Sequence, residues 1–146
     1  MAFTGNFMCT SFKVALLNGE MDFSSDTSQT FKIALFTSSA TLNASTTAYS
    51  TTNEISGTGY TAGGNTLTIS TNPTNATSGT TAFLSFSDTT WDSSTITARG
   101  ALIYKSGGTN PSIAVLDFGA DKSSSNSTFK VEFPTASDTT AILRIG

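Results

Sequence analysis

The residues most suggestive of chemistry are two carboxylates beside the only tryptophan, Asp88, Trp91 and Asp92 in SDTTWDSS. Cleavage of a glycosidic bond needs two carboxylates about 5–10 Å apart, and an exposed tryptophan ring could support a sugar. This spacing therefore raises the possibility of a carbohydrate-binding or glycan-cleaving module. Asp and Trp are also common in turns and cores, and we expect that structural role for these three residues.

A glycine-rich stretch, EISGTGYTAGGNTL at residues 54–67, superficially matches a nucleotide-binding loop. The spacing of its glycines departs from G-x-G-x-x-G, and Asn65 and Thr66 stand where a P-loop needs Lys and Ser or Thr. An alternating stretch follows the loop and predicts a strand, whereas both nucleotide motifs open a helix. We therefore expect these glycines to serve backbone geometry, through positive φ angles or close packing.

Other catalytic or metal-binding sets are sparse. Asp117 and Asp121 in LDFGADKS could ligate calcium, but a calcium site needs six or more oxygen ligands, so a structural turn is favoured. The chain has no histidine and one cysteine, Cys9, which excludes an intrachain disulfide and a Cys–His nucleophile and predicts a small buried side chain. No zinc site is expected. We predict a non-enzymatic protein without a cofactor.

Composition indicates a folded, weakly charged protein with a hydroxyl-rich surface. Charged residues make up 12% of the 146 residues, and the net charge is −3. Serine and threonine make up roughly a third of the chain, far above ordinary usage. Lys and Arg occur singly, which argues against nucleic-acid binding. No apolar run reaches the length of a membrane span, and the first 19 residues lack the pattern of a secretory signal, so we expect neither.

Periodicity predicts an all-β fold. Thr10 or Ser11 could cap a short helix over 12–17 that ends at Asn18-Gly19. Alternating or apolar stretches predict strands at 31–36, 66–70, 82–87, 95–105, 112–118, 127–133 and 141–145. Residues 37–53 and 71–80 are polar, without period, and predict loops. We expect an antiparallel β-sandwich of jelly-roll or immunoglobulin-like type with one short N-terminal helix, as a single domain over 1–146 in which 1–23 is a possible N-terminal arm.

Several blocks of the sequence together resemble a group of small structural proteins of tailed bacteriophages. They are MAFTGNF, SFKVALLNGEMDF, EISGTGYTAGG, WDSSTITARGALIY, AVLDFGADKS and FPTASDTTAILRIG, and they cover nearly the whole chain. The resemblance implies a virion component, either a capsid decoration (cement) protein or a tail or fibre part. It assigns no catalytic or binding residue.

An assembling β protein needs a contact surface, and the first 23 residues carry the densest set of large apolar side chains. The candidate interface comprises Phe3, Phe7, Met8, Phe12, Leu16, Met21 and Phe23. The alternative is that this segment covers the protein's own core. On the first reading we expect homo-oligomers and contacts with the major capsid protein or other virion proteins. The negative net charge favours a capsid exterior location over contact with packaged DNA.

Overall fold

The computed structural model describes residues 3–73 and 77–146, and it is an all-β sandwich with one short N-terminal helix. All strand pairs are antiparallel and fall into two sheets. The sequence-based fold class is confirmed. In the described part of the chain, no helix is long and apolar enough to span a bilayer.

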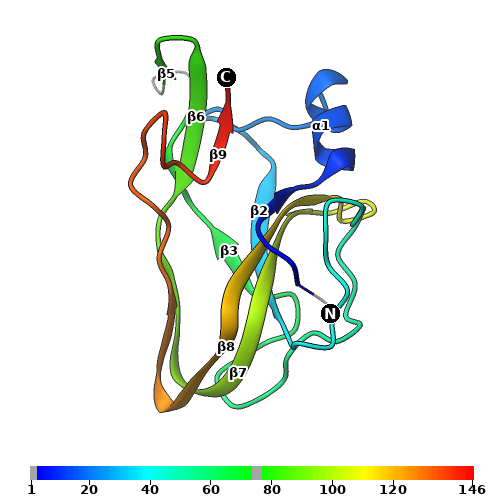
Figure 1. The fold of residues 1–146 in the computed structure, drawn as a ribbon, viewed down its shortest axis with the longest axis vertical. Coiled ribbons are helices and arrows are strands. Elements are labelled where there is room, and N and C mark those ends of the chain that lie inside the picture. Colours follow the sequence, from blue (N-terminus) through cyan, green and yellow to red (C-terminus); the bar gives the residue numbers. More distant parts are fainter. Residues whose placement is uncertain (1–2, 74–76) are drawn as a thin grey trace.

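The first sheet contains five strands (Figure 1), in the order β1, β8, β7, β2, β3. Their bounds are β1 Phe7–Met8, β2 Thr30–Phe36, β3 Asn65–Leu67, β7 Thr89–Ser106 and β8 Ser112–Val131. Strand β2 lies between β3 and β7, and its residues Ile33 to Leu35 are fully buried. It therefore reads as a nearly continuous apolar run, as expected for a strand covered on both faces.

The second sheet is built around β6 and carries the chain's last strand. Its strands are β4 Ile69–Thr71, β5 Thr77–Ser78, β6 Thr81–Phe86 and β9 Leu143–Ile145. Ala82 pairs with both Thr77 of β5 and Ile145 of β9, so β6 is flanked on both sides. The helix α1 (Thr10–Leu17) lies at the same end of the molecule as β9, at the top of Figure 1.

The long strands β7 and β8 form a ribbon that bends sharply and joins the two layers, at the bottom of Figure 1. Ser93 and Asn126 adopt positive φ angles at the bend. Ser94 is fully buried there, and its hydroxyl lies 2.7 Å from Ser124 Oγ and donates to Ser127 O at 3.0 Å. Further along, residues 118–121 of β8 oppose the single residue Arg99. Bulges of this kind bend a strand and strengthen its twist.

Several predicted strand boundaries were wrong. The predicted strands at 112–118 and 127–133 are one strand, β8, because pairing with β7 continues through the Ser-rich stretch between them. The predicted strand at 66–70 breaks at Thr68 into β3 and β4, which belong to different sheets. The predicted loop at 71–80 contains residues 74–76, outside the described residues, and its end forms β5, which returns to β6 through a turn at Gly79 (φ +57°).

The helix was predicted correctly at its C-terminus and wrongly at its N-terminus. Asn18 is the C-cap, and Gly19 follows with φ +71°, the left-handed conformation common after helices. The N-cap is Cys9, which makes no side-chain capping bond. Ser11 instead turns its hydroxyl towards Thr46 O and Ser112 Oγ, so tertiary contacts replaced the local cap.

The N-terminal segment is packed onto the protein's own core. Phe3 is buried, and its ring lies so close to Gly100 of β7 that a Cβ at Gly100 would be 2.4 Å from Phe3 Cε1. Phe12 and Phe23 continue this packing in an edge-to-face pair with ring centroids 5.9 Å apart. Phe23 stacks on Phe31 of β2 at 4.5 Å. Residues 3–23 thus complete the hydrophobic core in the folded chain.

This packing predicts unequal costs for two phenylalanines near the N-terminus. Phe3→Ala should lower the free energy of unfolding by about 3–5 kcal/mol, because it empties a buried site over Gly100. Phe7→Ala, at a half-buried position on β1, should cost about 1 kcal/mol. Urea denaturation of both variants measures the difference. Equal, small losses would show that Phe3 is not anchored as described.

Candidate functional site

The Asp88–Trp91–Asp92 set does not form a sugar platform. Trp91 is 3% exposed and packs between Tyr60 and Phe129, with ring centroids 6.0 and 6.1 Å away. Asp92, the next residue along β7, is exposed, since adjacent residues of a strand face opposite sides. The hypothesis that the Trp91 ring supports a sugar is therefore wrong. Strand β7 begins at Thr89, and its alternation places the Trp91 side chain in the core.

Both carboxylates of this set have structural partners. Asp88 accepts a hydrogen bond from the Phe133 amide at 2.9 Å and forms an ion pair with Lys130 at 3.1 Å. The amide bond and the lysine hold the pKa of Asp88 below its usual value. Asp92 accepts a hydrogen bond from Thr128 Oγ1 at 2.9 Å. These contacts tie the start of β7 to the end of β8.

The glycine-rich loop packs against strands, as predicted. Its four glycines all have positive φ angles, between +71° and +152°. A Cβ at Gly64 would lie 1.8 Å from Ile33 O, and a Cβ at Gly59 would lie 2.8 Å from Ser94 Cα. Thr58 bridges to Thr95 of β7 at the bend. At Gly57, Gly59 and Gly64 the loop needs glycine because its backbone lies against the backbone of neighbouring strands.

Beneath this loop lies a polar cluster centred on Glu54. Tyr49 and Tyr60 each donate a hydroxyl hydrogen bond to its carboxylate at 2.7 Å, and the Gly63 amide donates a third at 2.7 Å. Tyr104 stacks on Tyr49 at 4.5 Å and donates to Gly63 O at 2.8 Å. Sequence patterns did not predict this cluster, in which Tyr104 of β7 joins residues of the segment 49–63. Its groups bond to one another and to the backbone, which makes it an anchor for the loop.

Burial and Glu54 both affect the phenols of the cluster. Burial raises the pKa of Tyr49 and of Tyr60 well above the usual value. The hydrogen bond that each phenol donates to Glu54, and the negative charge of Glu54, raise both pKa values further. An amide hydrogen bond from Leu35 partly opposes this effect at Tyr60. Burial also raises the pKa of Tyr104, with a smaller contribution from the charge of Glu54.

The suggested calcium ligands are not brought together. Asp117 accepts from Arg99 Nε at 3.1 Å and from the Gly119 amide at 2.8 Å, which fixes the bulge of β8. Burial raises the pKa of Asp117, but these bonds and the arginine charge lower it more. Within residues 3–73 and 77–146, no group of three or more Asp, Glu, Cys or His side chains could hold a metal. Cys9 is buried, and burial raises the pKa of its thiol, so it behaves as a small apolar side chain.

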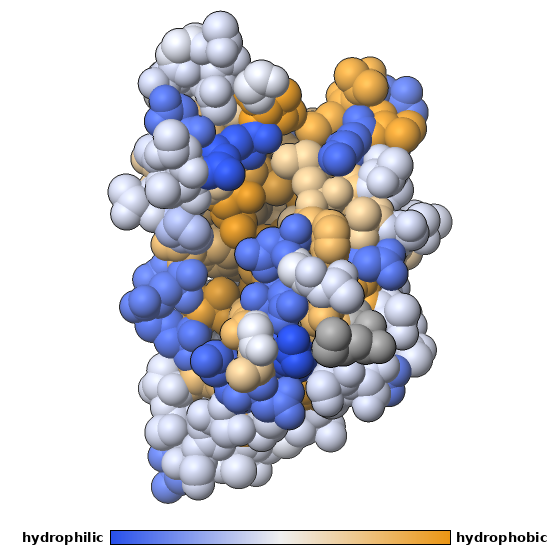
Figure 2. Space-filling model, viewed as in Figure 1, coloured by the Kyte–Doolittle hydropathy of each residue, from blue (hydrophilic) through white to orange (hydrophobic). Residues whose placement is uncertain are grey.

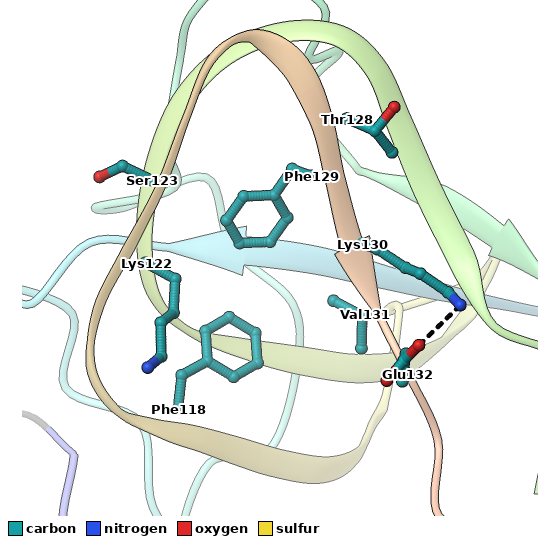
Figure 3. A pocket seen from close by; sticks show the side chains of 8 residues that line it. All are labelled: Phe118, Lys122, Ser123, Thr128, Phe129, Lys130, Val131 and Glu132. Carbon is teal, nitrogen blue, oxygen red and sulfur yellow. Dashed lines mark hydrogen bonds and ion pairs between the residues drawn. The ribbon is translucent and has the colours of Figure 1, made fainter.

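The concave side of bent strand β8 forms an open hollow of about 410 Å³. Figure 3 shows the rings of Phe118 and Phe129 between the two limbs of the strand, with Lys122 on one limb and Lys130 on the other. Lys130 is bound to Glu132 at 2.7 Å and to Asp88 at 3.1 Å. The hollow holds a carboxylate and two ammonium groups, but it brings no nucleophile and base together.

The seven predicted interface residues divide into two groups. Phe3, Phe12, Met21 and Phe23 are buried in the protein's own core, the alternative that the sequence left open. Phe7, Met8 and Leu16 are half-buried and remain accessible. A contact between folded chains can use this second group directly, and the interface itself stays a prediction.

These accessible residues open onto an apolar cleft between α1 and β9, which we call the α1–β9 cleft. Figure 2 shows hydrophobic surface in this notch, between the lobe of α1 and the lobe of β5, β6 and β9. Its walls are Met8, Phe12 and Leu16 on the helix side and Phe83, Leu84, Leu143 and Ile145 on the strand side. The central hollow measures about 120 Å³ and is almost entirely apolar. Met8 also lines a second hollow beside Leu17 and a third between β1 and β9.

The exposed large apolar side chains of the described residues all lie at this end. Leu17 is 90% exposed, Ile145 57% and Val14 52%. Leu17 and Ile145 line the same hollow. Residues 141–145 were predicted as a strand, but only tertiary structure places Leu143–Ile145 opposite the helix. This end exposes large apolar side chains beside an apolar cleft, which makes it the best candidate for a protein contact among the surfaces described.

Comparison with known proteins gave no match: no family model, no curated protein and no solved structure is similar to this chain.

The glycine packing predicts a large difference between two substitutions with the same backbone angle. Gly19→Ala and Gly64→Ala both place alanine at φ +71°, but only Gly64 has backbone atoms in the way. We expect Gly19→Ala to lower the free energy of unfolding by about 1 kcal/mol and Gly64→Ala by more than about 3 kcal/mol. Thermal or urea unfolding of the pair measures this. Similar losses would contradict the close contact with Ile33.

The tyrosine cluster predicts a distinctive alkaline titration. The usual pKa of 10.0 is raised in the folded state at each of the three tyrosines, so stability is present below about pH 10 and is lost as pH rises above it. At pH 10 the native protein should show clearly less tyrosinate absorbance than the urea-unfolded chain, which should be about half ionised. In Glu54→Gln, tyrosinate should form at lower pH. Native titration near pH 10 would refute the cluster.

Proposed function

We propose that this chain is a non-enzymatic structural protein of a tailed-bacteriophage virion, and that it is a capsid decoration protein attached through the α1–β9 end. The observation that carries the attachment site is the exposure of Leu17 and Ile145 beside an apolar cleft. Burial of such surface against a neighbour is the main favourable term in protein association. The virion assignment rests on the resemblance of the sequence blocks.

The remainder of the surface supports a passive role. Apart from the Lys130 and Arg99 ion pairs, the described surface is dominated by hydroxyl and amide side chains, and the net charge is −3. A protein packed against DNA gains from clustered positive charge, whereas this composition suits an outward or protein-facing position. Contacts that repeat in many copies can stiffen a shell even when each is modest.

Three polar groups that are buried or half-buried stabilise loops and bends of the fold. The Glu54 carboxylate, the Ser94 hydroxyl and the Asp117 carboxylate each bond to neighbouring backbone or side-chain groups that hold loops and bends in place. An acid–base or nucleophilic site needs groups poised towards open space. This distribution favours a building block over an enzyme.

The proposal predicts heat-sensitive particles when the protein is missing. Virions lacking this chain should release DNA at a lower temperature than complete virions, because the shell loses a repeated contact. Adding back the purified protein should restore resistance, and adding back Leu17→Asp should restore less, since a charge would enter the apolar contact. Thr80→Asp, at an exposed turn, is the control.

Copy number tests the position in the particle. A decoration protein should be present in hundreds of copies, whereas a tail or fibre component should be present in few. Quantitative mass spectrometry of purified particles measures this number. Equal heat resistance with and without the protein, or its absence from particles, would reject the cementing role.

A further inference from the structure

We propose that the α1–β9 cleft receives an extended segment of a different virion protein, which pairs with the free edge of β9 and alternates apolar with acidic side chains. This inference rests on the proposed attachment end and names the class of partner that it binds. Three observations support this inference: the free strand edges beside the cleft, the apolar residues Leu143 and Ile145 inside it, and the basic residues Lys13 and Arg144 at its rim.

Two strand edges flank the cleft. β9 pairs with β6 on one side through Leu143, Arg144 and Ile145, and its other edge has no backbone partner among the described residues. β1 is the terminal strand of the five-stranded sheet, and Phe7 and Met8 of β1 line a hollow together with Leu143 and Arg144. An unpaired edge offers a row of N–H and C=O groups to an incoming strand. Such an edge selects an extended segment over a helix.

The floor of the cleft suits the alternation of a strand. Leu143 and Ile145 point into the apolar hollow, because residues two apart in a strand share a face. A strand added beside β9 would direct every second side chain towards Met8 and Leu16 and the others towards solvent and the rim. Ile145 is 57% exposed whereas Leu143 is 4% exposed, so the part of the floor that the chain leaves uncovered is at Ile145.

The charged side chains that line the rim, Lys13 and Arg144, are basic in an otherwise acidic protein. Lys13 and Arg144 line the hollow beside Leu17, and no acidic side chain lines any of the three hollows that Met8 lines. The whole chain has ten acidic and seven basic residues, so this local balance is the reverse of the overall one. Neither Lys13 nor Arg144 belongs to an ion pair within the described residues. Arg144 donates from Nη1 to Thr139 O, which leaves its other N–H groups available.

This charge favours a different protein over a second copy. Two copies joined through facing clefts would bring Lys13 and Arg144 of one against those of the other, and like charges oppose that contact. A segment with glutamate or aspartate beside its apolar residues would neutralise the rim while filling the floor.

The test uses the purified full chain and two synthetic extended peptides of about ten residues. One alternates valine with glutamate, and the other alternates valine with lysine. At low ionic strength the glutamate peptide should bind at least about ten-fold more tightly, measured by fluorescence polarisation. Amide hydrogen exchange at Leu143–Ile145 should slow when the peptide is bound, because a new strand protects the edge.

Variants locate the binding. Lys13→Glu combined with Arg144→Glu should reverse the preference between the peptides, and Ile145→Asp should weaken binding of both. Lys122→Glu, in the hollow of β8, is the matched control and should change nothing. Circular dichroism verifies that each variant is folded, and the exchange measurement on the unmodified chain needs no variant.

Several outcomes would overturn the inference: equal affinity for the two peptides, a preference unchanged by the double reversal, dimerisation through the cleft, or binding to anionic vesicles with no binding of either peptide. If the protein stabilises particles but shows no peptide preference, only this inference fails. If the peptide preference holds but the protein is absent from particles, the proposed function fails and the binding site stands.

Discussion

The structure depends on the long pairing of β7 with β8, which resumes on both sides of their bend after each register shift. Paired residues run from Thr89 with Val131 to Tyr104 with Ser112, so one bent ribbon forms the centre of the five-stranded sheet. At the bend, the Ser94 hydroxyl satisfies buried polar groups that would otherwise cost about 1–3 kcal/mol each. The glycine loop then lies on the bend, and the Glu54 cluster fixes the loop. Most other features of this half of the molecule follow from that ribbon.

The two ends of the molecule are therefore built differently. The bend is closed by hydrogen bonds, short backbone contacts and the packing of Trp91. At the opposite end the α1–β9 cleft separates α1 from β6 and β9, and the terminal strands β1 and β9 leave their outer edges open. In the proposed binding mode the partner would enter a cleft that is already formed in the free chain, which lowers the entropic cost of binding.

Sequence patterns predicted what depends on local spacing. Phe31, Ile33 and Leu35 identified β2, Asn18-Gly19 identified the end of α1, and the failed spacing at Gly63 and Gly64 excluded a phosphate loop. The bend escaped prediction because SSSNST has neither apolar alternation nor a turn glycine, and its pairing with β7 is a long-range property. The cleft escaped for a similar reason. Leu17 and Ile145 are far apart in the chain, and only the folded structure brings them to one hollow.

The position of Trp91 also gives the molecule an intrinsic fluorescence signal for folding. It is the only tryptophan, and it lies among Tyr60 and Phe129 beside the bend, far from water. Its indole Nε1 has no hydrogen-bond partner in the described structure, so the ring sits in an apolar environment. Its fluorescence emission should therefore be blue-shifted in the native state and should move to longer wavelength when the ribbon opens. Tryptophan fluorescence therefore reports on the folding of the end of the sandwich that contains the bend.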